Sequence, residues 1–136
     1  MITVDLTQCK LLSTHLIPMR WVDMDAYQHM NNARYFDYMA EARVIFFQNI
    51  MKDPLTRYVL VHVACDFKKP LVYPKTIFIK QYFTGMTRTT FTFHHTFHDH
   101  DDKDSVCALG ESVIVCVDAH TSRPVIVPDN VRQLLL

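Results

Sequence analysis

The chain has 136 residues and a mass of 16.0 kDa, a length that fits one domain, residues 1–136, around a single hydrophobic core. Hydrophobic residues make up 49% of the sequence and charged residues 21%, and this composition excludes a disordered chain. Fourteen Lys and Arg residues balance fourteen Asp and Glu residues, so no net charge attracts nucleic acid or an anionic membrane surface.

Two kinds of sequence signal bear on location and ligands. The first residues lack the positive flank and continuous apolar run of a signal peptide, and no run of about eighteen apolar residues occurs. We therefore expect a soluble, cytoplasmic protein with no membrane partner.

The four cysteines have no CxxC spacing, which indicates reduced thiols. The two glycines, Gly85 and Gly110, are too few for a glycine-rich phosphate loop.

The first predicted elements are a strand over residues 15–22 and a long helix over residues 31–51. In the helix, four polar residues recur at spacings of 3, 4 and 7 and form one narrow stripe, while nearly all the others are apolar. These polar residues are Arg34, Asp37, Glu41 and Gln48. A surface helix usually keeps its apolar stripe to a third or half of its circumference, so we expect other parts of the protein to wrap around this one.

The rest of the sequence predicts strands. They cover residues 58–71, 75–83, 89–97 and 106–119, and a turn at 120–124 precedes a short terminal strand. Short connections make these strands antiparallel. We therefore predict an α+β fold in which a curved antiparallel sheet wraps around one long central helix. The Thr and His residues on the outer face are less polar than a fully solvated surface requires, which suggests oligomerisation.

Polar residues gather in WVDMDAYQHMNNARY, just before and at the start of the predicted helix. Asn31 or Asn32 is expected to cap the helix. A metal site would use Asp23, Asp25 and His29, but no second His or Cys lies nearby to complete the ligand set. Acid-base chemistry would use Asp25 or His29 beside free N–H groups at the positive end of the helix dipole. Such a site suits attack on a carbonyl group.

The run DMDAYQHMNNARYFDYMAEAR, residues 23–43, resembles the signature of hotdog-fold acyl-CoA thioesterases of the 4-hydroxybenzoyl-CoA thioesterase type, particularly the branch acting on long-chain acyl-CoA. The order of elements is similar as well, and residues 117–128 resemble the family's closing strand-turn-strand. The resemblance covers most of the chain, residues 14–130. It implies a hotdog fold that dimerises through sheet edges, often doubles to a tetramer, and works without a metal or organic cofactor.

The resemblance also implies catalytic roles. The catalytic carboxylate of the family is the second Asp of the Asp-x-Asp pair, which is Asp25 here, acting as nucleophile or as general base. N–H groups at the helix start receive the thioester carbonyl. His29 and Asn31 match the His-x-Asn of the long-chain branch, which implies that they position the water or the substrate. Asp23 is expected to be structural and to pair with Arg20 or Arg34.

Substrate contacts follow from the same resemblance. The family holds the phosphates of CoA near the turn that enters the fourth strand, often across the subunit interface, and Arg88, Thr89 and Thr90 match this place. The planar fork of Arg88 suits a phosphate. Lys68 and Lys69 are weaker candidates.

The acyl chain is expected in an apolar tunnel between helix and sheet, with Asn32 and Tyr35 contacting the substrate. Gln28 and Ser122 depart from the family pattern, because each stands where relatives commonly have Gly. Glu41 and Arg43 are expected to form a charged stripe or an interface pair.

A group of histidines on the strand over residues 89–97 and the turn after it suggests a second possible metal site. His94, His98 and His100 share one face of an extended chain, but nothing in the sequence fixes a geometry, so we predict no metal site there. His95 lies among phenylalanines and is expected to be a hydrogen-bonded core residue.

We predict an acyl-CoA thioesterase that hydrolyses fatty or aromatic acyl-CoA to the free acid and CoA, with acyl-CoA as its partner and a homodimer or homotetramer as its assembly. A thioesterase for acyl carrier protein is one alternative, although neutral net charge does not favour a carrier-protein surface. A non-catalytic acyl-CoA-binding hotdog module is another, and a hydratase ranks last.

Overall fold

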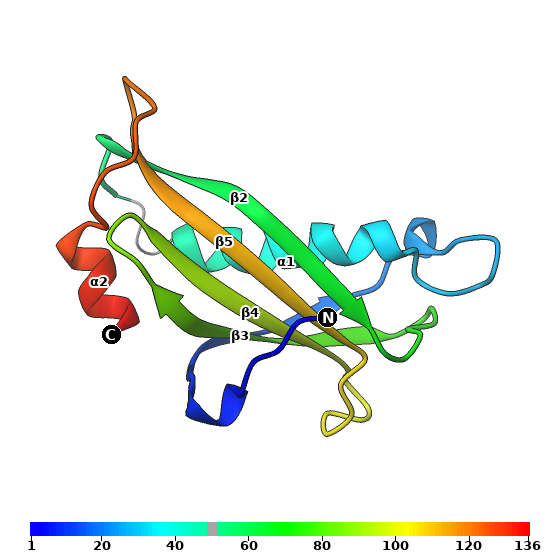
Figure 1. Cartoon of the computed structure of the whole chain (residues 1–136). Coiled ribbons are helices and arrows are strands. Elements are labelled where there is room, and N and C mark those ends of the chain that lie inside the picture. The colour runs from blue at the N-terminus through cyan, green and yellow to red at the C-terminus, as the bar shows by residue number, and fades with distance from the viewer. Residues whose placement is uncertain (49–51) are drawn as a thin grey trace.

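The computed structural model of the protein describes residues 1–48 and 52–136. Its strands are β1 (Lys10–Pro18), β2 (Thr56–Phe67), β3 (Thr76–Met86), β4 (Thr90–Asp99) and β5 (Ala108–Asp118). Its helices are α1 (Asn32–Gln48) and α2 (Asp129–Leu135), with 3-10 turns η1 (Leu6–Gln8) and η2 (Trp21–Asp23). The strands form one antiparallel sheet in the order β1-β3-β4-β5-β2, with α1 lying along one face (Figure 1). The predicted α+β fold is confirmed.

Helix α1 is buried on the side that faces the sheet and open on another side. Tyr35, Met39 and Phe47 are buried toward the sheet, and the helix comes so close that a Cβ on Gly110 would lie 2.6 Å from Met39 Sδ. Val44, however, is 50% exposed. The prediction that α1 is wrapped on nearly all sides is therefore wrong for the described residues of a single chain, because the sheet covers only one face of the helix.

The core consists of two apolar clusters with a polar belt between them. One cluster lies around Met39, Ile79 and Phe97, and the other around Phe47, Phe93 and Ile114. Four of the contributing elements carry a buried polar residue between their members of the two clusters. We call these residues the polar belt: Gln81 on β3, His95 on β4, Ser112 on β5 and Arg43 on α1.

Hydrogen bonds link the polar belt across the sheet. The His95 ring pairs through Nε2 with Gln81 Oε1 at 2.7 Å, and Gln81 Nε2 donates to Ser13 Oγ at 3.1 Å. Arg43 Nη1 donates to Ser112 Oγ at 2.8 Å. The expectation of a hydrogen-bonded core histidine at position 95 is confirmed.

Several predicted boundaries need correction. Strand β1 lies earlier than residues 15–22, because the chain leaves the sheet at Pro18 and turns into η2. The predicted end of the long helix, residues 49–51, lies outside the described residues. No helix in residues 1–48 or 52–136 is long and apolar enough to cross a membrane.

The predicted terminal strand is wrong, since the chain ends in α2. Pro124 forms an isolated bridge with Val117, and Val125 N donates to Cys116 O at 2.8 Å, but residues 125–127 form no strand. After Pro128, whose φ of −57° suits a helix start, Val131 and Leu135 bury the same side of α2 at a spacing of four residues.

The outer face of the sheet is crossed by the segment before β1. Ile2 N donates to Asp66 Oδ2 at 2.7 Å. Since β1 and β2 are opposite edges of the sheet and α1 occupies the inner face, this segment reaches β2 over the outer face. His94 and His98 are buried there. The segment before β1 therefore covers part of the weakly polar outer face of the sheet within the same chain.

Candidate active site

The loop between η2 and α1 is a small hairpin closed by backbone hydrogen bonds. Asn31 N donates to Asp23 O at 2.8 Å, Asp25 N to His29 O at 3.0 Å, and Gln28 N to Asp25 O at 3.0 Å. Gln28 has a φ of 63°, in the left-handed region that favours glycine, as does Ser122 with a φ of 60°. Both positions where the sequence departs from the family's glycines therefore keep the backbone shape that glycine would provide.

Asp23 fixes this loop to the helix. Its carboxylate is fully buried, lies 2.8 Å from Arg20 Nη2, and also accepts a hydrogen bond from the Tyr38 hydroxyl. Burial alone would raise the pKa of Asp23, but the hydrogen bonds from Arg20 and Tyr38 outweigh it and hold the pKa below its usual value. The predicted structural role and the pairing with Arg20 are observed, while Arg34 pairs with Asp37 instead.

Asp25 has a different environment. Its Oδ1 accepts a hydrogen bond from Tyr27 N at 2.9 Å, and its other oxygen has no partner among the described residues. The side chain lines a cleft of about 660 Å³ between the loop and the β2–β3 connection. The other lining residues are mainly apolar: Trp21, Val22, Met24, Gln28, Val72 and Tyr73. Asp25 therefore presents a carboxylate oxygen to an open apolar cleft.

The start of α1 lines a second, smaller cleft of about 210 Å³. His29, Asn32 and Tyr35 meet Lys68 and Lys69 there. The N–H of Asn32, the first residue of α1, has no acceptor in the part of the chain that the structure describes. The positive end of the helix dipole and two lysines thus face one cleft, which favours an anionic group.

Asn31 caps α1, as predicted for one of the two asparagines. Its Oδ1 accepts a hydrogen bond from Ala33 N at 3.0 Å. Tyr35 is mostly a core residue, since its ring packs edge-on against Phe67 and Phe97 with centroid distances of 5.0 and 5.3 Å. Burial raises the pKa of Tyr35 to about 12.

Arg88, Thr89 and Thr90 lie at the other end of the sheet. β4 begins beside the end of α1, where Phe91 packs on Phe47, and ends beside the start of α1, where Phe97 packs on Tyr35. The six residue steps from Phe91 to Phe97 span roughly 20 Å. One chain therefore does not bring these three residues to Asp25. The Thr90 hydroxyl is also paired with Thr87 Oγ1 at 2.6 Å within the β3–β4 turn.

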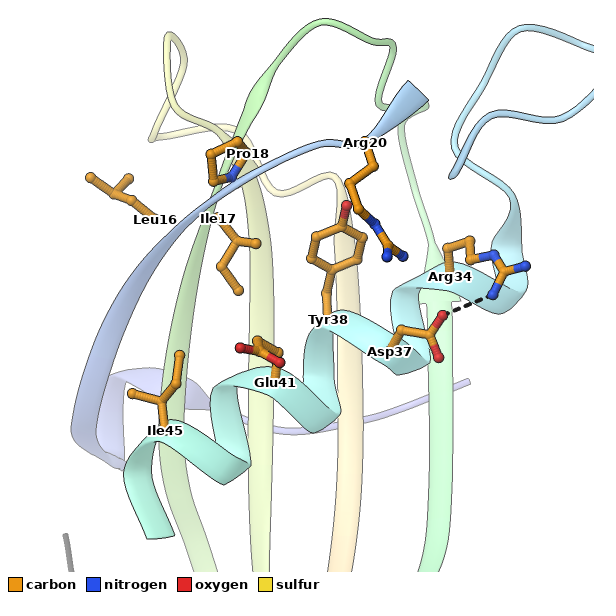
Figure 2. A pocket seen from close by; sticks show the side chains of 9 residues that line it. All are labelled: Leu16, Ile17, Pro18, Arg20, Arg34, Asp37, Tyr38, Glu41 and Ile45. Carbon is orange, nitrogen blue, oxygen red and sulfur yellow. Dashed lines mark hydrogen bonds and ion pairs between the residues drawn. The ribbon is translucent and has the colours of Figure 1, made fainter. Parts of the chain in front are cut away.

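Core side chains fill the space between the middle of α1 and the sheet, and clefts lie where α1 meets β1 and where it meets β2, so the acyl tunnel between helix and sheet stays a prediction. The largest of the five described clefts, about 670 Å³, lies between β1 and α1 (Figure 2). Glu41 points into it from α1, whereas Arg43 is buried in the polar belt. The expected charged stripe is therefore wrong, since Glu41 and Arg43 line different clefts, while the interface pair stays a prediction.

The described residues contain no group of three or more His, Cys, Asp or Glu side chains placed to hold a metal ion. His94 Nε2 and His62 Nε2 instead share the carboxylate of Glu111, at 2.9 and 3.0 Å.

Sequence reasoning missed the apolar walls of the Asp25 cleft. Trp21 and Val22 fall at the end of the predicted first strand, and Val72 and Tyr73 lie in the connection between two predicted strands. Trp21 and Val22 lie next to the Asp-x-Asp pair in the sequence, and this closeness could have indicated that they line the cleft. No sequence signal indicates Val72 and Tyr73, since only the fold brings them to the loop.

Comparison with known proteins places these features in a family. The profile of the thioesterase-like superfamily matches residues 19–135. A candidate thioesterase from Pseudomonas aeruginosa has a similar structure, with a TM-score of 0.87 and 31% identity, covering 93% of this chain and 100% of that one. A candidate acyl-CoA thioesterase from Xanthomonas campestris has a TM-score of 0.72 and 31% identity, covering 78% and 92%.

A third solved structure shares the fold at lower identity. The DHNA-CoA thioesterase from Staphylococcus aureus is 16% identical, with a TM-score of 0.74, and the match covers 84% of this chain and 79% of that one. The profile match includes the Asp23–Asn31 loop, α1 and the four strands that follow. The chain therefore belongs to the thioesterase-like superfamily and has its hotdog fold.

Proposed function

We propose that the protein hydrolyses the thioester bond of fatty or aromatic acyl-CoA to the free acid and CoA, with Asp25 as the catalytic carboxylate. Membership of the thioesterase-like superfamily supports thioester hydrolysis as the reaction class. The observation that carries the residue assignment is the oxygen of Asp25 that has no partner among the described residues and faces an apolar cleft in the loop that leads into α1. Asp23, by contrast, is already engaged by Arg20 and Tyr38.

The chemistry follows from this arrangement. In one route Asp25 attacks the thioester carbonyl carbon, the C–S bond breaks, and water then hydrolyses the mixed anhydride on Asp25 to release the acid. In the other route Asp25 removes a proton from a water that attacks the carbonyl carbon directly, and the C–S bond breaks. In both routes CoA leaves as the thiolate, which takes up the proton that the water loses. Negative charge develops on the carbonyl oxygen, and N–H groups at the start of α1 stabilise it. His29, whose carbonyl pairs with Asp25 N, positions the water or the substrate, and Asn31 holds the helix start in place.

Binding of CoA would use residues around the small cleft at the start of α1. Lys68 and Lys69 line the same small cleft as His29 and Asn32, so their charges suit the phosphates. In a single chain this makes them better placed than Arg88, which lies at the far end of the sheet.

A homodimer through β2 would bring Arg88, Thr89 and Thr90 of a second copy into reach. β2 is an edge strand with the exposed apolar residues Val59, Leu60 and Val61, and Val44 of α1 is exposed beside it. Antiparallel pairing of two β2 strands turns the second copy by half a turn. Its β3–β4 turn then lies at the end of the assembly where the first α1 begins.

Thiol release from a panel of acyl-CoAs of varied chain length and aromaticity tests the function. Asp25→Asn is expected to lower kcat on the order of a hundredfold or more in a folded protein. Asp37→Asn changes an exposed aspartate on α1 and should leave kcat within about twofold. Because the chain has four thiols of its own, protein without substrate is the blank for the disulfide reagent.

Two results would contradict the proposal. A full rate in Asp25→Asn would show that another group does the chemistry. Binding of acyl-CoA by the wild-type protein without any thiol release would identify an acyl-CoA-binding module instead.

A further inference from the structure

The hairpin loop that carries Asp25 also fixes the place of Gln28. Gln28 N donates to Asp25 O at 3.0 Å, which closes a turn, and Asp25 N donates to His29 O at 3.0 Å. Gln28 itself has a φ of 63°. This is the pattern of a three-residue hairpin loop, in which a turn is followed by one residue in the left-handed region. The Cα atoms of Asp25 and Gln28, the two ends of the turn, therefore lie within about 7 Å of each other.

Gln28 brings an uncharged hydrogen-bonding group into the Asp25 cleft. Both side chains line this cleft of about 660 Å³, whose other walls are mainly apolar. The carboxamide of Gln28 forms no hydrogen bond with the side chains or backbone of residues 1–48 and 52–136. Its Nε2 is free to donate and its Oε1 to accept. Trp21 and Tyr73 also have polar groups, but they come from other segments, so the turn does not fix their distance from Asp25.

The turn decides which part of a substrate the carboxamide can reach. In the proposed function, on which this inference rests, the thioester carbonyl carbon lies about 3–3.5 Å from the attacking oxygen of Asp25 or of its water. Gln28, at the other end of the turn, reaches the first carbons of the acyl group but not its far end. An oxygen on the second carbon would lie beside the carbonyl, where N–H groups of α1 are proposed to bind. The third carbon is the first position at which an oxygen would meet Gln28 alone.

Loss of water from the cleft makes the carboxamide selective. An acyl group that fills the cleft displaces water from Gln28, and a plain hydrocarbon chain then leaves the polar atoms of the carboxamide unpaired, which is costly. A hydroxyl group both accepts and donates, so it can pair with either atom of the carboxamide. A site that hydrogen-bonds a substrate hydroxyl discriminates against the analogue that lacks it.

We propose that the preferred substrate carries a hydroxyl group on the third carbon of its acyl group, and that Gln28 is the residue that selects for it. The substrate class is thus a 3-hydroxyacyl thioester. Gln28 determines specificity in this scheme, while the attack on the carbonyl carbon stays with Asp25.

Thiol release from matched pairs of 3-hydroxyacyl-CoA and unsubstituted acyl-CoA of equal chain length tests this selection. The wild-type protein is expected to favour one enantiomer of the hydroxylated substrate roughly fivefold or more in kcat/KM. Gln28→Met keeps the length of the side chain and loses the amide, so the two kcat/KM values should come within about twofold of each other. Gln28→Gly should have the same effect, and glycine suits the φ of 63°, so this variant is expected to fold.

Ser122→Gly is the matched control. Ser122 is the other residue with a positive φ, at 60°, and it lies in the turn after β5. Removal of its side chain should keep the wild-type ratio of the two kcat/KM values.

The outcomes separate this specificity from the proposed hydrolysis. A wild-type ratio near one, or a preference that persists in both Gln28 variants, would overturn the role of Gln28 while leaving hydrolysis by Asp25 intact. An equal loss of kcat/KM on both substrates in Gln28→Met would also overturn it, because the amide would then serve every substrate alike. No thiol release by the wild-type protein from any acyl-CoA would overturn the proposed function, and the specificity with it.

Discussion

Two aspartates separated by one residue have opposite environments in this protein. Asp23 is fully buried and accepts hydrogen bonds from Arg20 and Tyr38, so it is spent on holding the loop to α1. Asp25 keeps one oxygen without a partner among the described residues and faces an apolar cleft. The Asp-x-Asp spacing thus separates the aspartate that supports the loop from the aspartate proposed for catalysis, since the loop directs the two side chains to different sides.

His95 predicts how stability depends on pH. Burial and the charge of Arg43 lower its pKa to about 3, whereas an unfolded histidine titrates near 6.5. As pH falls below 6.5 the unfolded chain takes up a proton that the folded chain refuses, so stability present at neutral pH is lost through that window. Urea unfolding between pH 7 and 5 should show this loss.

His95→Gln removes the titrating group and should reduce the pH slope of the unfolding free energy by up to about 1.4 kcal/mol per pH unit, the limit for one proton. His120→Gln changes an exposed histidine and should keep the wild-type slope. The same slope in both variants would mean that other buried histidines account for the acid sensitivity.

At the scale of elements, the sequence predicted most where local rules and burial agree. The helix start at Asn31 and Asn32 follows from capping, and the strand pattern of β4 follows from its alternation. The wrong predictions about α2 and about the covering of α1 both depend on non-local contacts. α2 is only seven residues long, and its two buried residues complete a core formed by β4 and β5. The exposed side of α1 could not be inferred, because an apolar helix surface does not reveal whether its own chain or another covers it.

The contact between α1 and β5 leaves no free space for a side chain at Gly110 unless Met39 moves. A Cβ at Gly110 would lie 2.6 Å from Sδ and Cε of the fully buried Met39, so Gly110→Ala should destabilise the protein by about 1–3 kcal/mol through overpacking. Gly85→Ala is the matched control, since nothing lies within 4 Å of the Cβ there. Chemical denaturation measures both, and an equal cost would show that Met39 moves aside freely.

At the scale of the whole molecule, the free edges of the sheet differ in character. Beside β2 several exposed apolar residues of the sheet and of α1 lie together, whereas beside β1 the exposed Leu16 lies in a cleft with the charged residues Arg34, Asp37 and Glu41. This asymmetry favours association through β2. The candidate site could be predicted only in part from the sequence, because one chain keeps Arg88 far from Asp25. A second copy would be needed to bring an Arg88 close to Asp25.

Val61→Lys tests that association. Val61 is 58% exposed on β2, and a buried lysine there should halve the mass measured by light scattering and raise KM for acyl-CoA. Leu16→Lys introduces the same charge on β1, where Leu16 is 56% exposed, and should leave the mass unchanged. A wild-type monomer, or dissociation caused equally by both variants, would contradict the assignment of the interface to β2.

The segment before β1 holds Met1 and Ile2 beside strand β2. Because Ile2 is hydrogen-bonded to Asp66 on β2, a fluorophore attached to Met1 would be carried across the sheet to the edge where two copies are proposed to meet. In a β2-paired dimer, two identical dyes would lie near the seam and exchange excitation energy, which lowers the anisotropy of their emission. A dye on Leu136, held near the opposite edge by the bond from Lys10 Nζ to Leu134 O, would be the distant counterpart. Fluorescence depolarisation could then follow assembly in real time without any change inside the fold.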